Sequence, residues 1–280
     1  MMNKVAVGIL GATGIVGQQY VQLLADHPLF EIAFLTASSR NSGKTYREAV
    51  AGRWRGLGPT PEKVFNLPVY GVDDIKRASS LCRFVFSALD TDTAKVYEQL
   101  YASKGLPVIS NTSAHRLDPD VPLLIPEINP HHLAMIPLQK KRRGWENGFI
   151  VAKPNCSLQS YLMPLAPLHE TFKIRKIIVT TMQSVSGGGY PGVASLDIHD
   201  NIIPYIPNEE EKSEKEVLKI LGRVAEDRFA QEEDLIISAH CNRVPVLDGH
   251  LACVSVGFEK KPTLEQILSV WEEFRGLPQQ

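Results

Sequence analysis

One cysteine stands where a thiol could act as a nucleophile. Cys156 lies in the stretch KPNCSLQS (153–160), directly after a Pro-Asn pair, and the residues behind it can start a helix. A thiol at a helix N-terminus ionises more readily, because exposed amides and the helix dipole stabilise the thiolate. The alternative is that Cys156 is a small hydrophobic residue of the core, the usual place of a free cysteine. The Pro-Asn-Cys-Ser context favours the nucleophile, whereas Cys82, Cys241 and Cys253 lie in apolar runs and are expected in the core.

A thiol nucleophile also needs an acid or base and groups that fix its substrate. In NRVPVLDGHLAC, Arg243 and His250 lie seven residues apart across a Leu-Asp-Gly turn. A hairpin would bring both to one end of a sheet. Gln183, in TMQSVSGGG, could hold the attacked carbonyl. The alternative for His250 and Arg243 is a surface histidine and a surface ion-pair partner.

Glu209 and Lys212, in EEEK, add charges of both signs that suit an anionic substrate. The charge run 209–216, taken alone, equally fits a solvated helix face.

The first half of the chain has the pattern of a dinucleotide-binding fold. Residues 4–10 (KVAVGIL) form a short apolar run, and apolar residues recur at helical spacing from position 16 to 24. Between them the turn reads G-x-x-G-x-x-G, with Gly11, Gly14 and Gly17. Glycine lets the backbone approach a pyrophosphate, and the start of the helix binds the anion. The alternative is a plain glycine turn.

The residues after the second predicted strand (31–37) indicate the cofactor. NAD enzymes place an acidic residue there, whereas an arginine suits the 2′-phosphate of NADP. The stretch SSRNSGK (38–44) contains Arg40 and Lys44 and no acid, which predicts NADP over a merely solvated basic loop.

Further strands at 68–72, 83–89 and 107–110, with a helix at about 93–104, predict a Rossmann-type, doubly wound parallel sheet. Loops at the carboxyl ends of such strands face the ligand. SALDT (87–91) and SNTSAHR (110–116) are therefore candidate site loops, although the polar cluster in the second equally fits surface turn chemistry. That cluster comprises Asn111, Thr112, Ser113 and Arg116.

The second half predicts an α+β domain with a mainly antiparallel sheet. Strands are expected at 172–186, 234–240 and 250–258, and a charged helix at 209–228. The charged stretch 137–148 has no apolar period and is expected to be a loop. The predicted domains are 1–153, which binds NADP, and 154–280, which carries the chemistry.

Composition narrows the class of protein. The 280 residues are 44% hydrophobic and 22% charged, with a net charge of -1, as in soluble enzymes that act on small molecules rather than nucleic acid. No apolar run could span a membrane and no signal peptide is evident, so we expect a cytoplasmic protein. Four cysteines without a C-x-x-C pair argue for reduced thiols and against a metal site.

With these residues in view, the chain resembles aspartate-β-semialdehyde dehydrogenases of the archaeal and fungal branch, from residue 4 to about 275. The matching motifs, in order, are GATGIVGQ, SSRNSGK, SNTSAHR, PEIN, KPNCS, QSVSGGGYPG, EEEK and NRVPVLDGH. The resemblance implies that the chain uses NADPH to reduce L-β-aspartyl phosphate to L-aspartate semialdehyde, with release of phosphate. This reaction leads to lysine, threonine and methionine. The resemblance also implies a homodimer or homotetramer formed through the second domain.

The resemblance further implies a role for each matching residue. Cys156 would accept the acyl group, His250 would be the acid/base, and Gln183 would orient the acyl group. The implied substrate ligands are Arg243 for the α-carboxylate, Arg116, Asn155 and Lys212 for phosphate, and Glu209 beside them. The implied NADP-binding residues are Gly11, Thr13, Gly14, Ile15, Val16, Ser38, Arg40, Asn41, Ser87, Ser186 and Gly187.

Three departures from the family pattern and two rival interpretations accompany this prediction. Asn41 and Ser42 replace a serine and an alanine, and Asp90 replaces a proline. Family members continue for some tens of residues past position 280 into a segment that touches the cofactor, so a chain ending there is expected to bind NADP poorly or to be a partial sequence. The rivals are an acyl-CoA reductase resembling malonyl-CoA reductase, and a truncated, non-catalytic paralogue.

Overall fold

A computed structural model describes residues 4–56 and 58–277, which form two compact units. Unit 1 comprises Met1–Pro122 and Ile136–Lys153, and unit 2 comprises Leu123–Met135 and Pro154–Gln280. The chain enters unit 2 for good after Lys153, but the earlier segment Leu123–Met135 also belongs to unit 2. The units are therefore not contiguous in sequence, whereas the predicted ranges 1–153 and 154–280 were.

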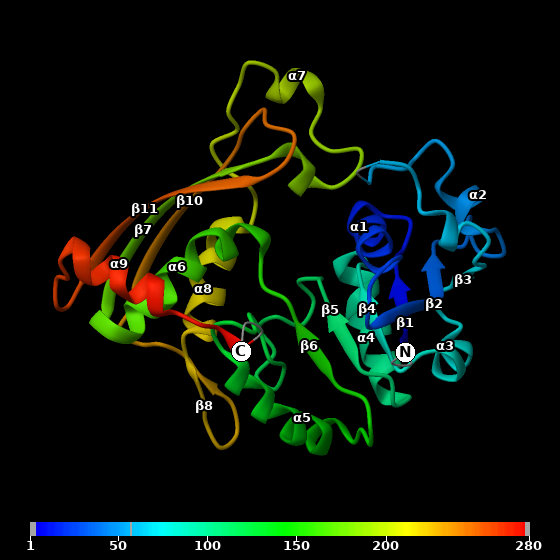
Figure 1. Cartoon of the computed structure of the whole chain (residues 1–280), viewed down its shortest axis with the longest axis horizontal. Helices are drawn as coiled ribbons and strands as arrows, with labels where there is room; N and C mark the ends of the chain where they lie inside the picture. Colours follow the sequence, from blue (N-terminus) through cyan, green and yellow to red (C-terminus); the bar gives the residue numbers. More distant parts are fainter. Residues whose placement is uncertain (1–3, 57, 278–280) are drawn as a thin grey trace. The chain divides into compact units, whose positions relative to one another are not determined.

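Unit 1 is built on a six-stranded sheet whose strand pairs are all parallel, which confirms the Rossmann-type prediction (Figure 1). The strand order is β3-β2-β1-β4-β5-β6, and the order reverses between β1 and β4. In such sheets the ligand binds beyond the carboxyl ends of the strands at this reversal. The strands are β1 (Val5–Leu10), β2 (Phe30–Ala37), β3 (Val69–Gly71), β4 (Phe84–Ser87), β5 (Val108–Ser110) and β6 (Ile150–Ala152). The helices are α1 (Ile15–Leu24), α2 (Tyr46–Val50), the 3-10 helix η1 (Glu62–Val64), α3 (Ile75–Leu81), α4 (Thr91–Ser103) and α5 (Ile136–Arg143).

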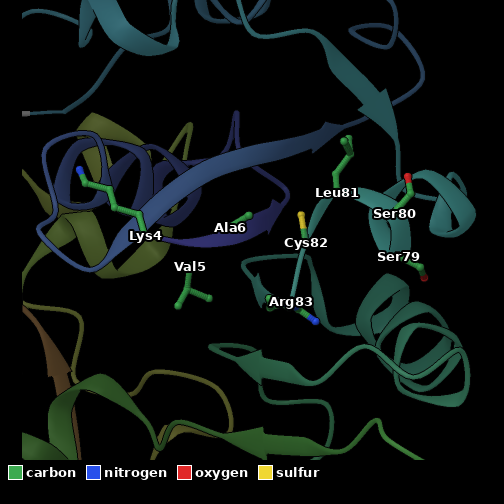
Figure 2. Close-up of a pocket in the computed structure, with 8 residues that line it drawn as sticks. All are labelled: Lys4, Val5, Ala6, Ser79, Ser80, Leu81, Cys82 and Arg83. Atoms are coloured by element: carbon green, nitrogen blue, oxygen red, sulfur yellow. The ribbon is translucent and has the colours of Figure 1, made fainter. Parts of the chain in front are cut away.

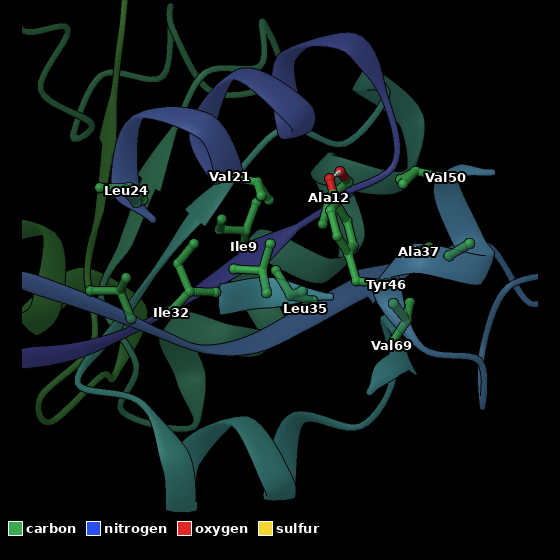
Figure 3. Packing of buried hydrophobic residues seen from close by; sticks show 13 residues of the cluster. Ile9, Ala12, Val21, Leu24, Ile32, Leu35, Ala37, Tyr46, Val50 and Val69 are labelled. Carbon is green, nitrogen blue, oxygen red and sulfur yellow. Dashed lines mark hydrogen bonds between the residues drawn. The ribbon is translucent and has the colours of Figure 1, made fainter. Parts of the chain in front are cut away.

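Apolar side chains from strands and helices form the core beside the glycine turn (Figure 3). Ile9 and Leu35, from neighbouring strands, are fully buried together with Val21 of α1. The Tyr46 hydroxyl donates to the Ala12 carbonyl at 3.0 Å, so the turn is tied to α2. This core fixes the backbone that the predicted cofactor site requires.

The predicted loop 137–148 was wrong, because most of it is helix α5. Polar contacts, rather than an apolar stripe, anchor this helix. The Gln139 amide donates to the carbonyls of Asp120 and Ile150, and Arg143 pairs with Asp118 and Asp120. Hydrophobic periodicity cannot reveal a helix that is anchored in this way.

Unit 2 contains a three-stranded sheet of order β10-β7-β11 (Figure 1). β7 (Ile174–Gln183) pairs in parallel with β10 (Ile236–Arg243) and antiparallel with β11 (His250–Phe258), so the sheet is mixed rather than mainly antiparallel. Helix α6 (Cys156–Phe172) packs on β11, and α8 (Glu209–Ile220) packs on β10. The remaining elements of unit 2 are η2 (Pro130–Met135), η3 (Val185–Gly188), α7 (Ser195–Ile198), β8 (Arg223–Val224), β9 (Phe229–Ala230) and α9 (Leu264–Glu273).

The charged helix ends earlier than the predicted residue 228. Gly222 follows it, and a Cβ at this position would lie 2.2 Å from the Ala230 carbonyl oxygen. The close approach requires glycine, and the chain turns there into the two-stranded hairpin of β8 and β9. None of the helices in the described ranges is long and apolar enough to cross a membrane.

Candidate active site

Three predicted residues form one row across the sheet of unit 2. Gln183 at the end of β7 is in register with Arg243 on β10 and with His250 on β11. Neighbouring strands lie about 4.8 Å apart, so the three side chains are adjacent. The predicted hairpin between Arg243 and His250 was wrong, since β7 lies between their strands. The expectation that both lie at one end of a sheet is met all the same.

Cys156 is the first residue of α6, and its thiol is exposed. Asn155 caps this helix, because its side-chain oxygen accepts from the Ser157 amide at 2.9 Å. The His250 Nε2 atom lies 3.2 Å from Cys156 Sγ, although the two residues are 94 positions apart. The nucleophile and the acid/base proposed from sequence are therefore in direct contact.

The other cysteines occupy different environments. Cys82 and Cys241 are buried as expected, and burial raises the pKa of Cys82 to about 12 and also raises that of Cys241. Cys253 is exposed, so its expected core position was wrong. On β11 its side chain points away from the face that α6 covers, since residues alternate along a strand. Of the four thiols, Cys156 alone contacts a histidine nitrogen in the described structure.

Arg243 is buried and fixed at the same end of the sheet. Its Nη1 atom donates to the Ser184 carbonyl at 2.7 Å. A Cβ at Gly187 would lie 2.8 Å from Arg243 Nη1 and 3.1 Å from His250 Cε1. The backbone at Gly187 thus passes close to both side chains, and a larger residue there would displace the end of the Arg243 side chain.

Glu209 links the start of α8 to the cap of α6. Its carboxylate accepts from Asn155 Nδ2 at 2.7 Å and from Lys212 Nζ at 2.9 Å. Burial acts to raise the pKa of Glu209, but the hydrogen bond and charge of Lys212, with hydrogen bonds from Asn155 and Gln183, outweigh it and hold the pKa below its usual range. Glu209 is therefore ionised, and it joins the predicted ligands of unit 2 in one network.

The alternative of a solvated face for 209–216 was wrong. Glu216 is buried, and its carboxylate accepts from the backbone amide of Asn155 at 2.6 Å. Glu210 and Glu214 accept from the amides of Cys241 and Ala239 on β10. Sequence reasoning missed Glu216. Its position seven residues after Glu209, on the same helix face, is the signal that could have found it.

Glu209→Gln is expected to lower the free energy of unfolding at pH 7 by about 1 to 3 kcal/mol, because the substitution removes charged hydrogen bonds in a half-buried site. The folded-state pKa of Glu209 is depressed, so its contribution is present above the unfolded pKa and is lost as the pH falls through the folded pKa. Urea unfolding at pH 7 and near pH 4 should show the difference shrinking. The exposed Glu211→Gln should change neither value, and an equal loss at both pH values would contradict the ion network.

The glycine turn of unit 1 fits a pyrophosphate. Gly11 has φ +78°, and a Cβ at Gly17 would lie 2.1 Å from the Gly11 carbonyl oxygen. Gly14 is the N-cap of α1 and has no side chain with which to cap the first-turn amides of Ile15 and Val16. Uncapped amides at the positive end of a helix are an anion site. Thr13 lies in the same turn and completes the predicted set there.

The loop after β2 fits the 2′-phosphate of NADP. Asn41 is buried, and its backbone amide donates to the Ser38 carbonyl at 2.9 Å. Lys44 Nζ donates to the side-chain oxygen Oδ1 of Asn41 at 3.1 Å. Arg40 lies in this turn, and the loop holds no carboxylate. Asn41, a departure from the family pattern, thus orders the loop that presents Arg40 and Lys44.

Two further loops of unit 1 carry predicted residues. Ser87 is buried at the carboxyl end of β4, and Arg116 is buried after β5 with its Nε donating to the Thr112 carbonyl at 3.0 Å. Asp90, the second departure, caps α4 by accepting from the Thr93 amide at 3.0 Å. Hydrogen bonds from the backbone and side chain of Thr93 lower the pKa of Asp90. Asp90 therefore has a structural role that needs no ligand.

A hollow of unit 1 lies at the other end of the sheet (Figure 2). It is lined by Lys4 and the start of β1, and by the end of α3 and the residues before β4, Cys82 and Arg83. These are the amino ends of the strands, whereas the glycine turn follows the carboxyl end of β1. The hollow is not where a dinucleotide would bind.

Two family models match most of the chain. The semialdehyde dehydrogenase NAD-binding domain matches residues 6–136, and the semialdehyde dehydrogenase dimerisation domain matches residues 165–280. The aspartate-semialdehyde dehydrogenase of Methanothermobacter thermautotrophicus is 44% identical over 275 residues, which are 98% of this chain and 77% of that protein. The malonyl CoA reductase (NADP) of Metallosphaera sedula is 39% identical over 282 residues, which are 100% of this chain and 77% of that protein.

Solved structures give the same result. The crystal structure of aspartate semialdehyde dehydrogenase with NADP from Candida albicans superposes with a TM-score of 0.88 at 38% identity, over 98% of this chain and 78% of that one. The match spans both units of the fold.

Proposed function

Because this chain belongs to the aspartate-semialdehyde dehydrogenase family, we propose that it reduces L-β-aspartyl phosphate with NADPH to L-aspartate semialdehyde and phosphate. The product is a precursor of lysine, threonine and methionine. The 3.2 Å contact of Cys156 Sγ with His250 Nε2, beside the row of Gln183 and Arg243, is the observation that carries the proposal.

Cys156 and the sheet row carry out the acyl transfer. The thiolate of Cys156 attacks the acyl carbon, the bond from this carbon to the phosphate oxygen breaks, and a thioester forms on Sγ as phosphate leaves. The Gln183 amide donates to the acyl oxygen, where negative charge develops. The buried guanidinium of Arg243 binds the α-carboxylate in a bidentate manner.

The thioester is then reduced to the aldehyde. When bound, NADPH would supply the hydride that reduces the carbonyl carbon, and the amides of the glycine turn would hold its pyrophosphate. The carbon–sulfur bond of the resulting thiohemiacetal breaks, the aldehyde leaves, and His250 returns a proton to the Cys156 sulfur. His250 thus acts as a base when the thiolate forms and as an acid when it is released.

Asn155 and Lys212 are the proposed phosphate ligands of unit 2, and Arg116 is the proposed phosphate ligand of unit 1. Asn155 Nδ2 donates one hydrogen to Glu209 and has a second to offer, and Lys212 uses one of its three donors on the same carboxylate. Glu209 thus orients both Asn155 and Lys212 toward the phosphate dianion.

The proposal is tested by the reverse reaction. The chain should form NADPH from NADP, L-aspartate semialdehyde and inorganic phosphate, and the rate should depend on phosphate. The rival activity, suggested by the 39% identical malonyl CoA reductase, predicts NADPH oxidation with malonyl-CoA instead. A folded chain inactive in both assays would support the non-catalytic paralogue and overturn the proposal.

Arg40→Ala is expected to raise the Michaelis constant for NADP by about ten-fold, because it removes a charged contact of the 2′-phosphate. The constant for NAD, which lacks this phosphate, should not change. Steady-state rates at varied NADP and NAD measure both values. Arg47→Ala serves as the control, since Arg47 stacks on the Phe65 ring instead. An equal change for both cofactors would contradict the assignment.

The match to a dimerisation domain supports an oligomer. We place its interface on the face of the unit 2 sheet that bears the exposed Ile178 and Leu251, and we propose a cytoplasmic homodimer or homotetramer. Light scattering after size-exclusion chromatography should give two or four chain masses. A mass of one chain at micromolar concentration would contradict this part of the proposal.

A further inference from the structure

Ser184 follows β7 directly and touches His250 with both its backbone and its side chain. Its amide donates to His250 Nδ1 at 3.1 Å, and its hydroxyl oxygen lies 3.4 Å from the same nitrogen. Ser184 is fully buried, and its carbonyl also accepts from Arg243. Neither the motif nor the family resemblance assigns this residue a role.

The amide of Ser184 selects one form of the neutral imidazole. A backbone N–H only donates, so Nδ1 must present a lone pair to it and the ring hydrogen resides on Nε2. Nε2 is the atom that faces Cys156 Sγ at 3.2 Å. In this tautomer His250 donates toward sulfur and cannot take the thiol proton.

Removing the thiol proton requires the other tautomer. Nδ1 must then carry the hydrogen and needs an acceptor. The hydroxyl oxygen of Ser184 can accept this hydrogen, whereas the backbone amide of Ser184 cannot. In this step the S–H bond of Cys156 breaks, a bond from hydrogen to Nε2 forms, and thiolate and imidazolium result. Ser184 Oγ lies 3.0 Å from Ser186 Oγ, so the Ser184 hydroxyl can donate its hydrogen to Ser186 while its oxygen accepts from Nδ1.

The charges around the ring make this acceptor important. Cys156 faces the ring from α6, and the cationic Arg243 approaches it from β10, across Gly187. Glu209 of α8 is bound to Lys212 and Asn155. A hydrogen bond from Nδ1 to the Ser184 hydroxyl stabilises the charged ring beside the Arg243 guanidinium.

We propose that Ser184 is a positioning residue which, by offering His250 Nδ1 both a donor and an acceptor, allows the ring to alternate between base and acid. The inference rests on the Cys156 and His250 pair of the proposed function, but not on its substrate. Ser184→Ala removes the acceptor and keeps the amide, so the ring should be held with hydrogen on Nε2.

The test is the pH dependence of Cys156 alkylation by iodoacetamide on the full chain, followed by mass spectrometry of the Cys156 peptide. Ser184→Ala should move the midpoint of the profile to higher pH by about one pH unit, since the imidazolium partner of the thiolate is lost. It should also lower kcat about ten-fold with little change in KM. Ser184→Thr, which keeps a hydroxyl, should restore the wild-type midpoint.

Ser213→Ala is the matched control, because Ser213 is equally buried but contacts Cys241 instead. Its midpoint should equal that of the wild type. An unchanged midpoint in a folded Ser184→Ala chain, or the same shift in Ser213→Ala, would overturn the inference. If Ser184→Thr fails to fold by circular dichroism, the ¹⁵N shift of His250 Nδ1 in Ser184→Ala decides, measured over the pH range in which the thiolate forms. An Nδ1–H population equal to that of the wild type across this range overturns the inference. A shifted midpoint in a chain that is inactive with aspartyl phosphate would refute the proposed function alone.

Discussion

Cys156→Ser is expected to lower the rate of phosphate-dependent NADPH formation by about four orders of magnitude or more. A serine hydroxyl in place of the thiol stays protonated at neutral pH, and His250 at 3.2 Å cannot compensate for the weaker nucleophile. The substitution changes one atom, so the cap of α6 by Asn155 should persist and the free energy of unfolding should hardly change. Initial rates at saturating semialdehyde, NADP and phosphate measure the loss.

Cys253→Ser provides the control for this experiment. Cys253 is also an exposed thiol of unit 2, but it lies on the face of β11 that α6 does not cover. Its substitution should leave the rate unchanged. A Cys156→Ser chain that keeps wild-type activity would exclude a thioester and with it the whole acyl-transfer mechanism.

His250→Asn is expected to lower kcat by about 10² to 10⁴, the usual range for loss of a general acid/base. Asparagine preserves polarity and a donor near Ser184, but it cannot carry a proton between sulfur and solvent. The KM values should change little, because Arg243 and the proposed phosphate ligands remain. Steady-state kinetics over pH 6 to 9 should show a flattened profile for the variant.

His240→Asn is the companion control. His240 is exposed on β10, where its side chain alternates away from the row that contains Arg243. A loss of activity equal to that of His250→Asn would show that the effect arises from the sheet and not from proton transfer.

Sequence reasoning predicted the parts of this molecule in which local pattern and chemistry coincide. The strand, glycine turn and helix around Gly11 follow one from another, because a buried parallel strand must be apolar and the turn after it must bend tightly. The start of α6 at Cys156 could be predicted for a similar reason, since Asn155 is a helix cap by residue type. In both cases the signal lies within a few residues.

The rest depended on contacts between distant segments. The position of β7 between β10 and β11 is invisible in the stretch from Arg243 to His250, which reads as a hairpin by itself. Helix α5 is anchored by Gln139 and Arg143 to other elements, and buried Glu216 reads as one more surface charge. A polar residue that meets its partner only in the folded chain leaves no periodic trace in the sequence.

The glutamates of α8 have a consequence for how the unit 2 sheet can grow. β10 is one of the two edge strands, and unpaired edge amides invite pairing with a strand of another chain and hence aggregation. The carboxylates of Glu210 and Glu214 accept hydrogen bonds from the Cys241 and Ala239 amides. Further along the strand, the backbone of Ile203 forms a β-bridge with Arg243. The chain's own carboxylates thereby occupy much of this edge, so a strand from a second copy is expected to extend the sheet beside β11 rather than beside β10.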